Sequence, residues 1–364
     1  MTKVAFLVNG GYDSPMGYRA RSFATHLAVS YDICIAYRAA NKFAAIVSFA
    51  IFLFRKRPAV IYVFDMAFSG VLAAVGRKSF ARTPLVIDTG DSISALARSM
   101  GRGRTGVWLT DCLEKLSFAF ADCIVVRGSC HLELLRKRNI RAELIRDGVV
   151  AAQFAPLDVT ELRRRKELYG VLTIGVIGSS IWNKKLQMCY GWDLVEAIRL
   201  LKEKPVKGIL IGGGSGVSRL RALSKEYGIE DKMLFPGFMP YEQLPLYLSM
   251  IDICLSTQTN DIVGQVRTTG KLPLYLASGR YILASDVGEA SLLLDREMLV
   301  PYDGVKDEGY PLKLAERINR LLEWKGSFGP LESHIALARD QFDYRVLAKR
   351  LAAVINSVLT NNLS

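Results

Sequence analysis

Short runs of β-branched and other apolar residues alternate with longer amphipathic segments along nearly the whole chain. This alternation of strands and helices is typical of parallel sheets covered by helices on both faces. The predicted strands of the first half are Val4–Val8, Ile33–Tyr37, Val60–Phe64, Leu85–Asp88, Cys123–Val126 and Ala142–Ile145. Those of the second half are Leu172–Ile177, Gly208–Ile211, Lys232–Phe235, Ile251–Leu255, Tyr281–Ala284 and Met298–Val300. We therefore expect an α/β protein with two doubly wound sheets.

The length of 364 residues exceeds the size at which a single core usually stops growing, so two domains are expected. After Pro156, the charged stretch Asp158–Lys166 has the composition of an interdomain linker, although it could form a helical turn. We predict a first domain over residues 1–160 and a second over residues 161–340. Residues 341–364 contain a final amphipathic helix, Tyr344–Leu359.

The segment from 251 to 288 predicts a strand, a polar loop, a short helix and another strand. Thr268 and Thr269 are candidate caps for this helix, which tolerates Pro273 only in its first turn and ends at Gly279.

A helix start presents unpaired N–H groups and a partial positive charge. Arg267 and Lys271 stand beside this start, and together with it they would form a cradle for a diphosphate. The alternative is an ordinary strand-to-helix crossover with solvated cations.

The same segment carries a resemblance to a known family. KLPLYLASGRYILAS is similar to the "P-x-K-L-x-E-Y-x-A-x-G-x-P-V-I-A-S" run of glycosyltransferase family 4, the retaining nucleotide-sugar transferases of the GT-B fold. Further similar segments follow in the family's order: VAFLVNGGYDSPMGYRARSFATHLA, RPAVIYV, PLVIDTGDS, LEKLSFAFADCIVVRGS, IRDGVVAAQFAP, IGVIGSSIWNKKLQMCYGWDLVEAIRLL, KGILIGGGS and DKMLFPGFMPYEQLPLYLSMIDICLS.

The resemblance implies two Rossmann-like domains that face each other across a cleft, with the C-terminal helix crossing back to the first domain. The first domain would bind the acceptor and the second the nucleotide sugar. The implied reaction is the transfer of a sugar, with retention, from a nucleoside-diphosphate sugar to a lipid-linked or polysaccharide acceptor. No cofactor and no metal is expected, since lysine and helix ends would neutralise the diphosphate.

On the donor side, the resemblance points to three glycine-containing turns and one lysine. Lys184 lies six residues after Gly178, where the family has its diphosphate-binding lysine. The family's arginine directly after the glycine is Ser179 here, and Arg267 is a candidate replacement. The other donor positions are Gly213, within the run from Gly212 to Gly214, and Phe238 and Met239, in the segment expected near the base.

The sharpest departure from the family concerns two glutamates that contact the sugar and the ribose. Val266 and Leu274 occupy their positions, so both carboxylates are missing. Asp261 and Glu289 lie nearby in sequence and are candidate replacements, or else they are exposed loop carboxylates. The loss puts the donor's identity, and activity itself, in question.

On the acceptor side, Gly10 and Gly11 form a loop after the first strand that would let the backbone approach a sugar phosphate. Gly17, Arg19 and Arg21 follow in the next helix. The loop lacks the full glycine pattern of a nicotinamide site.

In the family, the end of the fourth strand carries a His or Asp that faces the transferred sugar. Asp88 and Asp91 stand there, and Asp91 is the candidate for orienting a hydroxyl or acting as a base, or else for capping the following helix. The three histidines lie apart on predicted helices and form no metal set.

Net charge is +13, of which residues 1–160 contribute +9, from 21 Lys and Arg against 12 Asp and Glu. Arg55-Lys56-Arg57 directly follow the apolar segment Phe43–Phe54, an arrangement that favours adsorption to anionic lipid. The alternative is a sheet-packing helix with a solvated basic end. Nucleic acid is not expected, because no binding motif accompanies the charge.

The cysteines and the apolar segments indicate the compartment. The six cysteines show no CxxC pairing, which indicates buried thiols in a reducing environment. Residues 1–8 do not resemble a signal peptide, and Phe43–Phe54 is too short to span a bilayer. We expect a cytoplasmic protein, peripheral on the inner face of the membrane.

Two alternatives to a transferase stay open. One is a nucleotide-sugar 2-epimerase on the same fold. The other is a degenerate transferase that acts as a non-catalytic subunit in carbohydrate assembly, which the missing glutamates favour.

Overall fold

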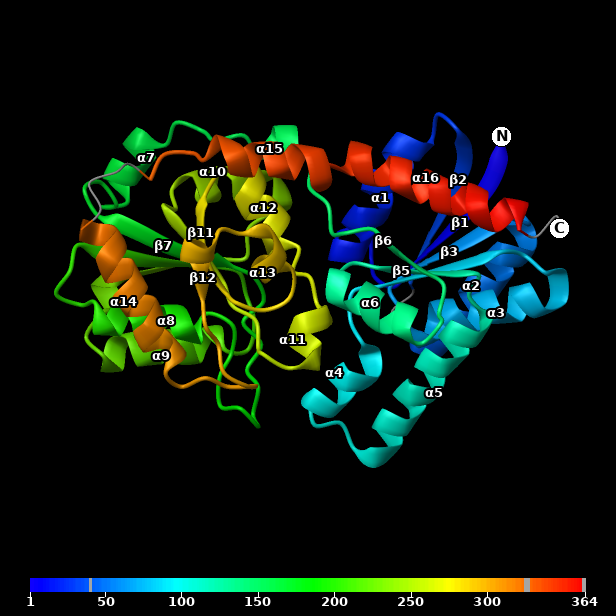
Figure 1. Ribbon diagram of the computed structural model, residues 1–364, viewed down its shortest axis with the longest axis horizontal. Coiled ribbons are helices and arrows are strands. Elements are labelled where there is room, and N and C mark those ends of the chain that lie inside the picture. Colours follow the sequence, from blue (N-terminus) through cyan, green and yellow to red (C-terminus); the bar gives the residue numbers. More distant parts are fainter. Residues whose placement is uncertain (39–40, 324–327, 362–364) are drawn as a thin grey trace. The chain divides into compact units, whose positions relative to one another are not determined.

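The computed structural model describes residues 1–38, 41–323 and 328–361, and the chain forms two compact units. The first unit contains residues 1–148, the short segment Gln265–Thr268 and the chain from Phe342 onward. The second contains Val149–Gly264 and Thr269–Gln341. Each unit has a six-stranded sheet in which all pairs are parallel (Figure 1).

The sheet of the first unit has the order β2-β1-β3-β4-β5-β6. Its strands are β1 (Thr2–Val8), β2 (Tyr31–Tyr37), β3 (Val60–Phe64), β4 (Leu85–Thr89), β5 (Cys123–Val126) and β6 (Ala142–Leu144). Every strand predicted in this half is present, with ends that move by two residues at most.

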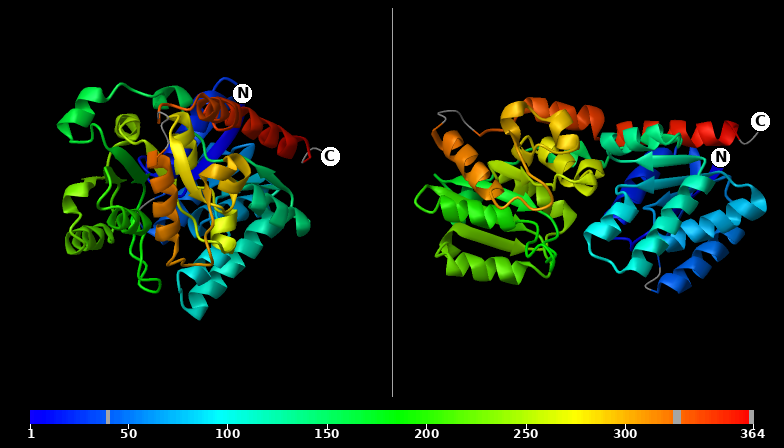
Figure 2. Two further views of the ribbon diagram at one scale, coloured as in Figure 1. Left: turned by 60° about the vertical axis from the view of Figure 1, so that its left-hand side comes forward. Right: turned by 60° about the horizontal axis from the view of Figure 1, so that its bottom comes forward.

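Helices cover both faces of the first sheet, as the views of Figure 2 also indicate. Alternate strand residues such as Leu7, Ile61 and Ile87 pack with α2 (Lys42–Lys56), α3 (Phe68–Ala81), α5 (Arg104–Phe120) and α6 (Ser129–Lys137). On the other face lie α1 (Pro15–Leu27) and α16 (Tyr344–Thr360), where Phe23 meets Tyr344 with ring centroids 5.4 Å apart. The short helix α4 (Ile93–Ser99) precedes α5.

The sheet of the second unit has the order β12-β11-β10-β7-β8-β9, which is the Rossmann order when its strands are counted from β7. Its strands are β7 (Leu172–Ile177), β8 (Val206–Ile211), β9 (Met233–Gly237), β10 (Ile253–Ser256), β11 (Tyr281–Ser285) and β12 (Leu299–Val300). The six strands predicted in the second half are all present.

The second sheet has α8 (Trp192–Leu200), α9 (Val217–Glu226) and α14 (Tyr310–Glu323) on one face (Figure 1). On the other lie α10 (Leu244–Ser249), α12 (Lys271–Ala277) and α15 (Glu332–Gln341). The remaining elements are short: η1 (Ala151–Phe154), α7 (Thr160–Arg165), η2 (Glu230–Lys232), η3 (Tyr241–Gln243), α11 (Ile262–Val266), α13 (Glu289–Leu293) and η4 (Arg296–Met298).

The stretch Asp158–Lys166, predicted as a linker, is part of the second unit. It contains α7, and the Arg163 guanidinium donates from Nη1 to Asp252 Oδ1 at 3.1 Å and to the Met250 carbonyl at 2.7 Å. The helical turn left open as the alternative is what the structure shows, because a charged composition does not separate a linker from a helix whose arginine binds the sheet.

Within residues 1–38, 41–323 and 328–361, no helix is both long enough and apolar enough to cross a membrane.

Candidate functional site

The strand order of the second sheet reverses between β7 and β10, and open parallel sheets bind ligands at such a switch point, beyond the strand carboxyl ends. The turn Gly178-Ser179-Ser180 follows β7, and Thr257 follows β10. The switch point therefore lies where the sequence placed the donor site.

The turns after β7 and β8 bind each other through their backbones. The Gly178 N–H donates to the Ile211 carbonyl at 2.9 Å, and the Ser180 N–H donates to the Gly213 carbonyl at 2.8 Å. A Cβ at Gly212 would lie 1.9 Å from the Gly178 carbonyl oxygen, and its φ of +140° belongs to glycine. This close approach is the reason for glycine at position 212.

The ammonium group of Lys271 lies against the Gly178 turn. A Cβ built on Gly178 would lie 2.5 Å from Lys271 Cε and 3.2 Å from Nζ. The Nζ atom also lies 3.7 Å from the ring centroid of Tyr190, within the range of a cation–π contact. The structure thus brings together two residues predicted for the donor site, Gly178 and Lys271.

Two tyrosines, Tyr275 buried and Tyr190 half-buried, bind the ends of the neighbouring strands. The Tyr190 hydroxyl donates to the Leu255 carbonyl at the end of β10, at 3.1 Å. The Tyr275 hydroxyl accepts the Ile177 N–H at the end of β7, at 2.9 Å. Burial raises the pKa of both phenols well above the ordinary value, so both are neutral donors and acceptors. Sequence reasoning missed this role, although Tyr275 lies within the quoted motif.

Asp193 is a second residue that the sequence analysis did not single out. It stands in the first turn of α8 and is buried, and its carboxylate accepts the hydroxyl of Thr257, the residue after β10. Burial raises the pKa of Asp193, although the Thr257 hydroxyl and the backbone N–H groups of its own turn act against the rise. A buried carboxyl at the switch point can hold or orient a hydroxyl group.

Lys184 is exposed in the loop between β7 and α8. Its carbonyl accepts the Gln187 side-chain amide at 2.6 Å, and Asn183 pairs with Met188 across the loop. The described contacts fix the backbone of this residue and not its ammonium. Its predicted contact with a diphosphate stays a prediction.

The predicted helix cap is wrong. The helix α12 begins at Lys271, its N-cap residue is Gly270, and no side chain bonds to that cap. Thr268 instead donates its hydroxyl to Asp147 at 3.3 Å, and Thr269 accepts the Leu272 N–H through its carbonyl. Pro273 does lie in the first turn, and Ser278 and Gly279 end the helix, as predicted.

Val266 and Leu274, at the positions of the family's glutamates, are both buried. Asp261 accepts the Gly264 N–H at 2.9 Å and so caps the short helix α11. Glu289 is buried at the start of α13 and is not the exposed loop carboxylate of the alternative interpretation.

The exposed side of the second-unit site contains Ser179 and Phe238, and Met239 beside it is half-buried. Phe238 directly follows Gly237 at the end of β9 and is among the most exposed aromatic side chains described, at 80%. An exposed aromatic ring beyond the carboxyl end of a strand can stack on a planar group of a ligand.

In the first sheet the order reverses between β1 and β3. Beyond those two strands, the Asn9 side-chain amide donates to Asp65 Oδ2 at 3.3 Å. Asp65 adopts a left-handed backbone with φ of +71°, and burial raises its carboxyl pKa despite the attraction of Arg127. A half-buried carboxylate with a left-handed backbone at a switch point is a functional-site candidate that no sequence motif indicated.

Asp88 is buried in an ionic network and does not face an acceptor. Its carboxylate accepts Arg19 Nε, Arg127 Nε and the Tyr62 hydroxyl, each at 2.9 Å. Arg19 also donates to the Ile145 and Arg146 carbonyls and is 1% exposed. Arg19 is therefore a buried structural residue of the first unit.

Asp91 is partly exposed and pairs with Arg267, whose Nε lies 2.8 Å from Asp91 Oδ1. Arg267 lies in the short segment that groups with the first unit. Two of the three residues predicted as catalytic, Asp91 and Arg267, thus pair with each other.

The loop after β1 is tight. A Cβ at Gly10 would lie 2.3 Å from Ser14 Oγ, and Ser14 caps α1 by accepting the Gly17 N–H at 3.1 Å. Gly11 has open space around it. Arg21 lies over the Tyr12 ring at 3.7 Å. A sugar phosphate can therefore approach the backbone more easily at Gly11 than at Gly10.

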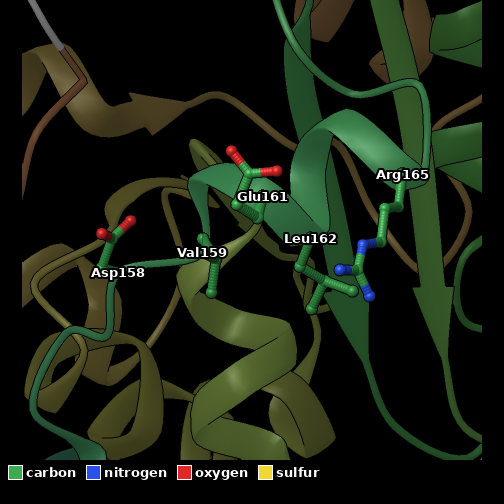
Figure 3. A pocket seen from close by; sticks show the side chains of 5 residues that line it. All are labelled: Asp158, Val159, Glu161, Leu162 and Arg165. Atoms are coloured by element: carbon green, nitrogen blue, oxygen red, sulfur yellow. The ribbon is translucent and has the colours of Figure 1, made fainter.

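A surface hollow of about 320 Å³ lies along α7 and the turn before it (Figure 3). Its lining residues are Asp158, Val159, Glu161, Leu162 and Arg165. Carboxylates and a guanidinium share this lining, and it contains none of the residues predicted for the site. We do not assign it to the donor or the acceptor.

Residues 192–266 match the family model described as "Glycosyl transferases group 1". A 2-deoxystreptamine glucosyltransferase of Streptomyces kanamyceticus is 25% identical over 177 residues, which is 47% of this chain and 42% of that protein. The chain thus matches less than half of the length of this curated relative.

Three solved structures superpose over nearly the whole chain. The sucrose-phosphate synthase of Thermosynechococcus elongatus has a TM-score of 0.80 and 15% identity over 99% of this chain and 100% of its own. HepE of Anabaena in complex with UDP has a TM-score of 0.76 and 15% identity, with 98% and 100% covered. WaaG, a glycosyltransferase involved in lipopolysaccharide biosynthesis, has a TM-score of 0.69 and 13% identity, with 97% and 99% covered.

These comparisons establish the fold. The chain has the GT-B fold, with two Rossmann-like domains, as the sequence resemblance implied. Residues 192–266 are similar to the group 1 glycosyl transferases. Membership of family 4 in particular stays a prediction.

Proposed function

We propose that this protein is a retaining glycosyltransferase that moves a sugar from a nucleoside-diphosphate sugar to a lipid-linked or saccharide acceptor. The observation that carries the proposal is the ammonium of Lys271 against the Gly178 turn, at the switch point of a Rossmann sheet. The group 1 match over residues 192–266 and the UDP held by the similar fold of HepE support it.

In the proposed reaction, the acceptor hydroxyl attacks the anomeric carbon while the bond from that carbon to the diphosphate oxygen breaks. The leaving diphosphate takes the proton of the hydroxyl, so no protein nucleophile is needed. The protein supplies cations where negative charge develops, and an interaction of this kind contributes a few kcal/mol. Lys271, and Lys184 from its exposed loop, are the candidate cations. Independence from metal is part of the proposal.

Hydroxyl groups of the two substrates need acceptors and donors in fixed positions. In the second unit we propose Asp193 with Thr257 for this role, in place of the missing glutamates. In the first unit we propose Asp91, with Asp65 at the switch point. These assignments rest on position at strand ends and, for Asp193, on burial.

One observation favours the alternative that this protein is a non-catalytic relative of the glycosyltransferases. Val266 and Leu274 are buried, so buried apolar side chains stand where the related enzymes have carboxylates. A protein of this kind would still bind a nucleotide at the Gly178 turn but would not turn it over. Release of free nucleoside diphosphate in the presence of acceptor separates the two possibilities.

The test measures nucleotide binding first and turnover second. A thermal-shift panel of UDP, GDP, ADP and their sugars should identify one stabilising base, because ligand at 100 times its dissociation constant adds about 2.7 kcal/mol. No stabilisation by any of them would refute the donor site.

Alanine at Lys184 or at Lys271 should then weaken nucleotide binding and turnover. We expect a loss of roughly 30- to 1,000-fold, about 2 to 4 kcal/mol, because the diphosphate charge is left uncompensated. Lys185→Ala is the matched control, since Lys185 is an exposed neighbour on the same loop. Unchanged affinity in both folded variants would rule out these cations.

A further inference from the structure

The helix α2 leaves one apolar face uncovered. Phe43, Val47, Ile51 and Phe54 are 80%, 59%, 47% and 66% exposed. Their spacing of four, four and three residues places them in one stripe along the helix. We call these four residues the α2 stripe.

The opposite face of the same helix is packed. Ala45, Phe49 and Leu53 are fully buried, and Phe49 and Leu53 belong to the core between the sheet and its helices. The sheet-packing interpretation therefore accounts for one side of the helix only. Contiguous exposed apolar side chains of this size usually mark an interaction surface.

The neighbouring helix α3 extends the surface. The helices α2 and α3 pack side by side. Each connects two parallel strands, so they run in the same direction and end at the same edge of the sheet. Phe80, in the last turn of α3, is 93% exposed. An apolar ring thus lies at the end of α3 that corresponds to Phe54 on α2.

The charged side chains of these two helices and of the residue after α2 all have one sign. Arg55, Lys56 and Arg57 are exposed directly after the α2 stripe. The sequence contains no acidic residue between Asp32 and Asp65, and none between Asp65 and Asp88, so neither helix carries a carboxylate. On α3, the charge of Lys78 is balanced by Asp122, which lies just before β5.

We propose that the α2 stripe, Phe80 and Arg55-Lys56-Arg57 form a docking surface for an anionic lipid bilayer. An apolar helix face with adjacent cations lies in the membrane interface, with its rings among the acyl chains and its cations at the headgroups. Charge complementarity decides the occupant, because a second copy of the chain would bring the same cations against these.

The surface is independent of catalysis. It agrees with a lipid-linked acceptor, but vesicle binding needs neither nucleotide nor acceptor. A failure of this proposal would leave the donor site untouched, and a failure of the donor site would leave this surface untouched.

The experiment is cosedimentation of the full chain with phosphatidylcholine vesicles that contain 0% or about 30% phosphatidylglycerol. We expect binding to the anionic vesicles only. Replacing Arg55, Lys56 and Arg57 with serine should lower the partition coefficient on the order of 100-fold, as expected for three cations near an anionic surface. Salt at 1 M should act similarly, because the Debye length shrinks to about 3 Å.

The matched control is the same triple replacement at Arg136-Lys137-Arg138. These residues end α6 of the same unit, are exposed and have the same composition. A second variant, Val47→Ser with Ile51→Ser, removes apolar groups without changing charge and should weaken binding roughly 10-fold. Both the basic triple and the apolar double variant should fold, because the replaced side chains are exposed.

Three results would overturn the proposal. The first is a wild-type protein that does not sediment with anionic vesicles. The second is equal binding by the wild type and both α2 variants. The third is an equal loss in the α6 control, which would assign the effect to net charge alone.

Discussion

The buried carboxylate of Asp88 allows a prediction with a definite size. It accepts two guanidinium hydrogen bonds and one phenol hydrogen bond, and its residue is 0% exposed. In Asp88→Asn the negative charge disappears while the shape stays. Arg19 and Arg127 then share the carboxylate of Asp147, at 3.6 Å and 3.7 Å, and Arg127 also keeps Asp65 at 3.8 Å.

Removing one partner of a buried ion pair leaves an uncompensated charge and typically costs about 3 to 5 kcal/mol. We expect the first unit to lose this much of its free energy of unfolding. That is a large fraction of the total, since domains are stable by only about 5 to 15 kcal/mol. The variant should therefore be marginal and should still fold at low temperature.

The pH dependence has a definite sign. Burial by itself raises the pKa of Asp88, but Arg127 and Arg19 outweigh it, and the pKa in the folded chain lies below the ordinary value. The stabilisation is therefore complete above an ordinary carboxyl pKa of about 4 and is lost as pH falls below it. The difference in free energy of unfolding between the wild type and Asp88→Asn should become smaller as the pH falls below about 4.

Hydrogen exchange followed by mass spectrometry measures the stability of the two units separately. Peptides from β1, β3 and β4 should exchange roughly 100- to 1,000-fold faster in Asp88→Asn if exchange follows opening of the first unit. Peptides from β7 and β8 are the internal reference. The matched variant is Asp91→Asn, whose side chain pairs with Arg267 at the surface and should contribute about 0 to 1 kcal/mol.

Equal exchange rates in Asp88→Asn and Asp91→Asn would refute this account of the network. So would a first unit whose wild-type stability does not fall as the pH drops below about 4.

Two further predictions concern the second unit. Gly212→Ala should abolish nucleotide-induced thermal stabilisation, because its Cβ would meet the Gly178 carbonyl oxygen at 1.9 Å, whereas Gly213→Ala, whose Cβ meets no protein atom within 4 Å, should lower that stabilisation less. If both variants behave alike, the close approach of the two turns does not matter for binding. Tyr275→Phe should destabilise the second unit by about 1 to 3 kcal/mol in denaturant unfolding, because the buried Ile177 N–H loses its acceptor. Unaltered stability would show that another group accepts that N–H.

The twelve strands were predictable because a strand of a covered parallel sheet is apolar on both faces and reads as a continuous run. Val60–Phe64, Cys123–Val126 and Leu172–Ile177 have the predicted bounds. The helix end at Gly279 was also predictable from local sequence, because a glycine with φ of +61° ends a helix by its own conformation. The cap at Thr268 was wrong because Asp147, far away in sequence, binds its hydroxyl.

For the candidate site, the sequence determined which turns contain glycine and which positions carry lysine. It could not determine which of those residues meet, because a contact between Lys271 and Gly178 joins segments about ninety residues apart and depends on the strand order. Nor could the sequence determine that Asp88 forms buried ion pairs with Arg19 and Arg127, whereas Asp91 pairs with Arg267 and stays partly exposed. Two aspartates three residues apart look alike in a sequence. Only the packing of helices on the sheet decides which of them is buried, because burial and the partners of a charge are properties of the whole fold.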